Sequence, residues 1–225
     1  MEQKKVWAVY WSATGTTKRV VTRIAERVAQ ALDAPVSEYD FTLPEARQGT
    51  PDFTAEDLVI FGTPTYAGRV PNVLLKYLAT VQGHGAAAVP VVTFGNRAFD
   101  DSLIELRDIL ADNGFVPFAA AAFVGEHSFS NTLAAGRPDA DDLTLAAEFA
   151  AQIAERVAEV SADTPSIAVP GRAREERAYY QPRDRAGKPV DIRKVKPKTS
   201  EACDNCGLCA KVCPMGSINP ENVRD

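Results

Sequence analysis

Four cysteines lie close together near the C-terminal end of the sequence. They are Cys203, Cys206, Cys209 and Cys213, and Pro214 follows the last of them. This spacing, C-x2-C-x2-C-x3-C-P, is the one in which thiolates hold iron–sulfur clusters. The short spacers let the thiolates converge on one cluster, and the proline ends the loop because it fixes φ and removes a backbone donor. The cysteines therefore predict a 4Fe-4S site, with electron transfer as its chemistry.

Two other chemistries remain open for these cysteines. Pairs of the form C-x2-C also build tetrahedral zinc sites, although zinc motifs normally bring two pairs separated by a longer loop. A disulfide is the third alternative. Where two clusters share such runs, the fourth cysteine of each run ligates the other cluster, and this sequence contains one run. We therefore expect a longer natural chain with a second run and two clusters, or else a single cluster completed in another way.

A second group of chemically suited residues is the run of hydroxyls from Ser12 to Thr17. Its sequence, Ser-Ala-Thr-Gly-Thr-Thr, follows an apolar run and opens a helical pattern. Hydroxyls on a small-residue turn, with the free amides of a helix N-terminus, bind a phosphate dianion without any cation. A Ser/Thr helix cap explains one hydroxyl but not four in six positions. The alternatives fail on spacing, because G-x-G-x-x-G is absent and Lys18 lacks the upstream glycine of a P-loop.

The elements that position these residues alternate along the first 160 residues. Apolar runs predict strands at residues 5–11, 36–41, 58–61, 89–94 and 117–124. Amphipathic patterns predict helices at 20–32, 71–81, 101–113 and 143–160, the third opened by Ser102 and Glu105 as a capping box. Residues 42–57 are loop-like, with at most a short helix. Buried strands that alternate with helices predict a parallel α/β sheet covered on both faces, whose ligands lie at the carboxyl ends of the strands.

Two further loops at that edge carry suitable groups. After the third strand, glycines let the backbone approach a planar ligand, Tyr66 is placed to stack on it, and Pro71 is expected at the first position of the next helix. After the fourth strand, residues 95–100 offer an amide, a guanidinium and an aromatic ring. Asp100 and Asp101 are interpreted as helix caps rather than catalysts. Trp11 is interpreted as sheet core, and His127 as a local hydrogen-bond partner or, alternatively, a proton donor.

Composition and charge limit the function classes. The chain has 225 residues, a formal net charge of -5, and 45% hydrophobic residues, as is ordinary for a globular protein. No apolar stretch approaches the length of a membrane span, and residues 6–11 are too short for a signal peptide. Thiolate ligands require a reducing compartment, so we expect a cytoplasmic protein without membrane insertion.

Positive charge is concentrated in one segment. Residues 170–200 contain ten Lys or Arg against four Asp or Glu, a net of +6, with proline and glycine punctuation. The segment is interpreted as a solvated linker, with an electrostatic patch for an acidic partner as the alternative. Nucleic acid is not expected as a partner, because the rest of the chain is acidic and no aromatic ladder accompanies the basic residues.

The sequence resembles a known protein family in several of these segments. The run from Val9 to Thr17, Val-Tyr-Trp-Ser-Ala-Thr-Gly-Thr-Thr, resembles the FMN phosphate loop of flavodoxins. The chain as a whole resembles bacterial flavodoxin–ferredoxin fusion proteins, also over the strand-three and strand-four loops, residues 125–130, the basic linker and residues 203–218. The resemblance implies a flavodoxin-like, doubly wound parallel five-stranded sheet of order 2-1-3-4-5, FMN at the switch point, and a C-terminal module with two 4Fe-4S clusters.

The resemblance also implies a domain division and a site. Residues 1–161 form the flavodoxin-like domain, 162–199 the basic linker, and 200–225 a truncated ferredoxin-type segment. The residues expected to hold FMN are Ser12, Thr14, Gly15, Thr16, Thr17, Pro64, Thr65, Tyr66, Ala67, Gly68, Arg69, Gly95, Asn96, Arg97 and Phe99. Arg69 or Arg97 is expected near the anionic edge of the ring, and Cys203, Cys206, Cys209 and Cys213 are the metal ligands.

These inferences predict an electron-transfer flavoprotein that relays electrons between FMN, 4Fe-4S clusters and partner redox proteins, a reductase or a ferredoxin. The first alternative is a flavin-dependent reductase of quinone or another small oxidant. The second is a phosphate-ligand sensor with a structural zinc. The donor, the acceptor and the oligomeric state are not specified by the sequence.

Overall fold

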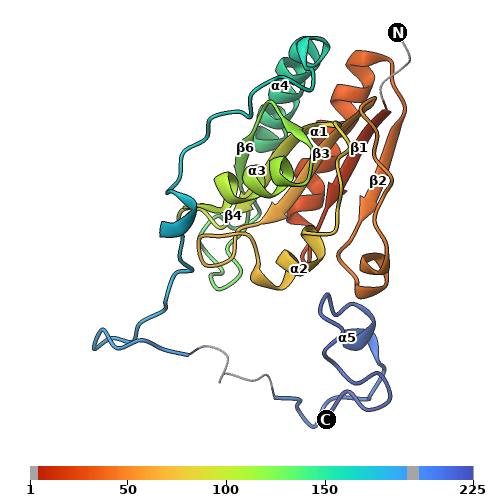
Figure 1. Ribbon diagram of the computed structural model, residues 1–225. Coiled ribbons are helices and arrows are strands. Elements are labelled where there is room, and N and C mark those ends of the chain that lie inside the picture. The colour runs from red at the N-terminus through yellow and green to blue at the C-terminus, as the bar shows by residue number, and fades with distance from the viewer. Residues whose placement is uncertain (1–4, 192–197, 225) are drawn as a thin grey trace.

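A parallel sheet with helices on both faces forms the body of the protein (Figure 1). The structure, a computed structural model, describes residues 5–191 and 198–224. The strands are β1 (Lys5–Tyr10), β2 (Val36–Asp40), β3 (Asp57–Pro64), β4 (Ala87–Phe94), β5 (Val116–Pro117) and β6 (Ala121–Val124). Their order is β2-β1-β3-β4-β5, and β6 also pairs with β4. The predicted order 2-1-3-4-5 is confirmed.

The fifth position of the sheet differs from the prediction. A single strand at 117–124 was expected, but β5 pairs with Ala87 and Ala88, whereas β6 pairs with the later part of β4 from Val91 onward. The carbonyl of Ala88 accepts the amide of Phe118, so Pro90, two residues further along β4, faces the same neighbour. Proline has no N–H to donate, and the ladder is interrupted opposite it.

The helices are distributed over the two faces of the sheet. They are α1 (Thr16–Leu32), α2 (Leu75–Leu78), α3 (Ser102–Asp112), α4 (Ala140–Arg156) and α5 (Leu208–Lys211), with 3-10 turns η1 (Pro44–Gln48), η2 (Asn72–Leu74), η3 (Val157–Glu159) and η4 (Arg174–Glu176). α1 and α4 cover one face, where Val20, Ile24 and Ile153 pack on Val6 and Ile60. α2 and α3 pack on the opposite face of the sheet, around Trp11, Phe41, Phe53, Phe61 and Phe115. None of the described helices is long and apolar enough to cross a membrane.

Two predictions about helix starts are wrong, the one for Pro71 and the one for a capping box of Ser102 and Glu105. The expected helix at 71–81 is only η2 followed by one turn of α2, and Pro71 caps it from outside instead of occupying its first position. Ser102 and Glu105 do not form a capping box, because the Ser102 hydroxyl donates to the carbonyl of Phe99 and the Glu105 carboxylate is bound elsewhere. The structure instead forms a capping box at α4, between Asp139 and Asp142.

The first half of the basic segment lies on the domain. The amide of Ile167 donates to the carbonyl of Pro117 at 2.8 Å, and that of Tyr180 donates to the carbonyl of Ala67 at 2.8 Å. Residues 167–182 of the predicted linker 162–199, which we call the strap, thus contact the domain through their backbone. Residues 192–197 of the predicted linker lie outside the described residues. The cysteine segment contacts η1, where the Arg47 guanidinium donates to the carbonyl of Pro214 at 2.7 Å.

Candidate functional site

A cavity of about 540 Å³ opens at the carboxyl ends of β1, β3 and β4, a size typical of small-molecule sites. Ten of the fifteen residues predicted to hold a cofactor line it: Ser12, Thr14, Thr16, Thr17, Pro64, Thr65, Tyr66, Ala67, Gly95 and Arg97. The remaining five are placed beside it without lining it: Gly15, Gly68, Arg69, Asn96 and Phe99. The walls are mostly apolar and aromatic, and hydroxyl groups are gathered at the end formed by α1.

The loop between β1 and α1 leaves several backbone amides unpaired at the start of a helix. Gly15, with φ of 82°, makes the turn into the helix, which begins without a side-chain cap and without an acidic residue in its first turn. Within the described chain, four amides of this loop and helix start have no hydrogen-bond acceptor: Ala13, Thr14, Thr16 and Thr17. Free N–H groups at the positive end of a helix dipole are the kind of donors that suit an anion.

The four hydroxyls of the loop divide into two kinds. The Thr17 hydroxyl is buried and lies 2.7 Å from that of Thr93, so it holds α1 against β4. The Ser12 hydroxyl accepts the amide of Lys18 at 3.1 Å. The Thr14 and Thr16 hydroxyls lie 3.4 Å apart, face the cavity, and are the two available to an entering anion.

The loop after β3 presents Tyr66 to the cavity. Residues 66–69 form a tight turn, in which the amide of Tyr66 donates to the carbonyl of Arg69 at 2.9 Å and the reverse bond is 3.1 Å. Ala67 and Gly68 both have positive φ, 50° and 80°, as in a type I′ turn. The Tyr66 ring packs edge-on to the buried Trp11 at 5.8 Å, and burial raises the pKa of its phenol. The ring is thus fixed at the rim while part of it faces the cavity.

The two candidate arginines lie in different environments. Arg69 turns away from the cavity, forms an ion pair with the buried Glu105, and lies 4.6 Å from the Tyr179 ring. The hydrogen bond with Glu105 raises the pKa of Arg69. Arg97 lines the cavity and lies 4.2 Å from the centre of the Tyr180 ring. Of the two, Arg97 remains the candidate for a cation beside a bound ring.

His127 and its loop also line the cavity. The Nδ1 atom of His127 accepts the amide of Phe129 at 3.1 Å, which agrees with its interpretation as a local hydrogen-bond partner. The backbone of Gly95 packs directly on the imidazole, where a Cβ would lie 2.7 Å from Cδ2. The Phe129 ring is 94% exposed beside the cavity. A second, polar cavity of about 380 Å³ adjoins the first and shares five lining residues with it: Thr14, Thr16, Glu126, His127 and Ser128.

Several lining residues were not predicted as site residues. They are Ala13, Thr93, Phe94, Gly125, Glu126, His127, Ser128, Phe129, Tyr180 and Pro182. Thr93 and Phe94 end β4, so the rule that ligands lie at carboxyl ends of strands was sufficient to find them. Tyr180 and Pro182 come from the strap, and no local pattern marks a basic, proline-punctuated segment as part of a cavity wall.

The cysteine segment carries four thiols of the kind that bind metals, but among the described residues these thiols do not lie close together. All four thiols are free, and in the described part of the chain no three His, Cys, Asp or Glu side chains come close enough together to hold a metal ion. The Ser217 hydroxyl and the amides around it lower the pKa of the Cys213 thiol to about 7. That environment favours the thiolate, which is the form that ligates iron. The ligand chemistry therefore fits an iron–sulfur cluster.

Comparison with known proteins identifies both parts of the chain. A flavodoxin domain model matches residues 8–95, and a 4Fe-4S binding domain model matches residues 197–219. The first match contains the loop between β1 and α1 and the turn after β3, and the second contains all four cysteines. The chain thus combines a flavodoxin domain with a 4Fe-4S motif, the arrangement of a flavodoxin–ferredoxin fusion. These two parts indicate an electron-transfer role with FMN and a 4Fe-4S cluster as cofactors.

Solved structures with a similar trace include several flavodoxins. A flavodoxin from the domain Archaea is 15% identical, with 68% of this chain and 99% of that chain covered and a TM-score of 0.47. Flavodoxin 1 from Bacillus cereus is 17% identical, with 70% and 100% covered and a TM-score of 0.48. Rubredoxin oxygen:oxidoreductase from Desulfovibrio gigas is 18% identical, with a TM-score of 0.47, and the match covers 70% of this chain but only 38% of that one. A search of curated proteins gives no match.

Proposed function

We propose that this protein relays electrons between FMN bound at the carboxyl edge of the sheet, iron–sulfur chemistry at the cysteine segment, and partner redox proteins. The observation that carries the proposal is the pairing of the uncapped α1 N-terminus with an aromatic-walled cavity of about 540 Å³. The free amides and the Thr14 and Thr16 hydroxyls suit a phosphate, and the adjoining apolar walls suit a planar ring. FMN carries both groups.

The residues of the cavity have separable tasks in this proposal. The α1 N-terminus binds the phosphate through hydrogen bonds and the helix dipole, without a cation. Tyr66 supplies an aromatic wall, and Arg97 supplies positive charge at the rim. Flavin exchanges one or two electrons and an iron–sulfur cluster one, so a protein with both suits transfer between two-electron donors and one-electron carriers.

The first test is binding, carried out under argon with the full chain. FMN and riboflavin are titrated into the protein, and iron and acid-labile sulfide are measured after reconstitution. A matched control carries serine at all four cysteine positions, Cys203, Cys206, Cys209 and Cys213. We expect FMN to bind both chains equally, and iron and sulfide to be retained only by the unmodified chain. A colourless protein that contains zinc would favour the phosphate-ligand sensor.

The second test is electron flow between the two parts. The reconstituted chain is mixed in a stopped-flow instrument with a chemically reduced ferredoxin, which is a one-electron donor. The relay predicts rapid bleaching of the flavin in the unmodified chain and slow bleaching in the four-serine control. Full bleaching by NADH or NADPH alone within seconds, or multiple turnovers with a quinone, would instead favour the flavin-dependent reductase.

A further inference from the structure

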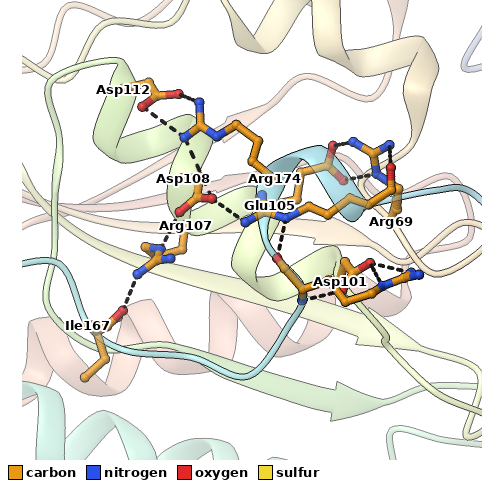
Figure 2. A network of polar contacts seen from close by, with 10 residues as sticks. Arg69, Asp101, Glu105, Arg107, Asp108, Asp112, Ile167 and Arg174 are labelled. Carbon is orange, nitrogen blue, oxygen red and sulfur yellow. Dashed lines mark hydrogen bonds and ion pairs between the residues drawn. The ribbon is translucent and has the colours of Figure 1, made fainter.

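The strap leaves the sheet near β5, crosses α3 and ends at the cavity. Gly171 lies so close to Ile104 of α3 that a Cβ at that glycine would sit 2.2 Å from the Ile104 Cγ2 atom. The Arg107 guanidinium donates to the carbonyl of Ile167 at 2.8 Å, which fixes the start of the crossing (Figure 2). The crossing is therefore packed closely on the helix.

Three arginines of the strap pair with three aspartates that begin, line and end α3. Arg172 binds Asp101 through its amide at 2.9 Å and through its guanidinium Nε at 2.8 Å. Asp101 is buried, and although burial alone raises its pKa, the bonds from Arg172 hold that pKa below its usual range. The positive charge attributed to a patch for an acidic partner is thus partly neutralised within the chain.

The other two arginines extend the attachment along α3. Arg174 donates to Asp112 at 2.6 Å and lies 3.7 Å from Asp108 (Figure 2). Arg177 donates to Asp108 at 2.6 Å, and its side chain is only 4% exposed. Removal of one partner from such a partly buried pair leaves the other charge without compensation. These contacts hold the strap in one register on the helix.

The register of the strap determines what reaches the cavity. The Tyr179 hydroxyl donates to the carbonyl of Val70 at 2.8 Å, and the amide of Tyr180 donates to the carbonyl of Ala67 at 2.8 Å. Both acceptors belong to the loop after β3. The Tyr180 ring consequently lines the cavity and stacks with the guanidinium of Arg97.

We propose that the strap is a part of the flavin site and not a connection between domains: Tyr180 contacts the flavin ring, and the attachment of the strap to α3 is coupled to flavin binding. The inference rests on the proposed function, because it assumes that the cavity holds a flavin. An aromatic ring in contact with another contributes to affinity independently of the phosphate. Coupling is reciprocal, so a flavin that holds the strap is itself bound more tightly when the strap is attached.

The first experiment measures affinity in the full chain. Tyr180→Ala is compared with Tyr180→Phe, which keeps the ring and loses the hydroxyl. We expect Tyr180→Ala to weaken FMN and riboflavin alike, by roughly 3- to 10-fold, and Tyr180→Phe to bind both nearly as tightly as the unmodified chain. A loss that affects FMN but not riboflavin would overturn a ring contact.

The second experiment measures attachment of the strap. Trypsin cleavage after Arg172, Arg174 and Arg177 is followed by mass spectrometry, with and without saturating FMN. The double variant Asp108→Asn, Asp112→Asn removes the carboxylates that pair with Arg174 and Arg177 of the strap and with Arg107 of α3. Its control Glu148→Gln, Glu155→Gln makes the same charge change at exposed positions of α4.

FMN is expected to slow cleavage of the unmodified chain and the control. The double variant Asp108→Asn, Asp112→Asn should be cut faster and should bind FMN more weakly. Unchanged cleavage on addition of FMN, or unchanged flavin affinity in Tyr180→Ala, would overturn this inference while the proposed function stood. An unmodified chain that binds neither FMN nor riboflavin would overturn both.

Discussion

Replacement of the two free hydroxyls of the β1 loop by valine tests the phosphate site most directly. Valine has nearly the shape of threonine, so Thr16→Val keeps the methyl group that packs against Gly125, where a Cβ at the glycine would lie 2.4 Å from it. Only the hydrogen bond is removed. Because Thr14 and Thr16 bond to nothing but each other in this structure, at 3.4 Å, the change does not disturb another contact.

The expected magnitude follows from the charge of the acceptor. A hydrogen bond to a charged group contributes about 1.5 to 3 kcal/mol, and every 1.4 kcal/mol is about tenfold in affinity. Each valine should therefore weaken FMN binding roughly 10- to 100-fold. Thr14 is exposed and Thr16 half-buried, so we expect the smaller loss at Thr14. The double variant should lose less than the sum, because two hydroxyls so close together bond to the same group.

The assay is fluorescence titration with FMN and with riboflavin, which lacks the phosphate. Riboflavin affinity should stay unchanged in both variants. Thr144→Val, at an exposed position of α4, is the control for threonine replacement in a helix, and Thr17→Val reports on the buried pair with Thr93. The latter should lower the free energy of unfolding by about 1 to 3 kcal/mol. Equal losses for FMN and riboflavin would refute the reasoning, and no loss for FMN would place the phosphate elsewhere.

Three other predictions concern charge. Arg97→Gln should lower the flavin midpoint potential in a redox titration by about 20 mV, because roughly 1 kcal/mol of screened attraction is lost, and Arg97→Lys should not. In urea unfolding, Glu105→Gln should cost about 2 to 3 kcal/mol because it breaks a buried ion pair, whereas the exposed Asp112→Asn should cost less than about 1 kcal/mol. The pKa of Asp101 is lower in the folded chain than the value of about 3.9 in the unfolded chain, so its contribution to strap attachment is complete above that value and is lost as the pH falls through the folded pKa. Hydrogen-exchange protection of the Arg172 amide should therefore decrease below about pH 4. Asp101→Asn should abolish that pH dependence. A potential unchanged in Arg97→Gln, equal costs at the two carboxylates, or protection independent of pH would contradict the respective prediction.

The fold was predictable because its signals are local and repeated. Apolar strand-length runs, helical spacing and the hydroxyl loop each occupy a few neighbouring residues, and the rules for parallel sheets then bring the loops together. What failed depended on contacts distant in sequence. Ser102 and Glu105 have the spacing of a capping box, but Glu105 binds Arg69, which lies 36 residues away. Arg69 and Arg97 occupy equivalent loops, but Arg69 binds Glu105 and the carbonyl of Arg177, whereas Arg97 lines the cavity.

The strap was also not predictable from the sequence, because its contacts are distant in sequence. Its composition indicates a solvated linker, yet three of its arginines pair with Asp101, Asp108 and Asp112, and a single sequence does not reveal those pairs. Attachment of the strap shortens the free chain that connects the domain to the cysteine segment. If the free connection began at residue 162, its 41 residues to 202 would span at most roughly 140 Å. With the strap attached, the free connection begins at residue 183, and its 20 residues to 202 span at most roughly 70 Å.

Attachment of the strap therefore halves the distance that the cysteine segment can reach, and it moves the origin of the connection to Pro182, on the wall of the cavity. A shorter connection that starts beside one site raises the effective concentration of the second site there, provided that it still spans the gap. For a protein that transfers electrons between the two sites, this makes the encounter within one chain favourable over an encounter between chains. Electron transfer within the double variant Asp108→Asn, Asp112→Asn should accordingly be slower than in the unmodified chain, even at FMN concentrations that saturate both.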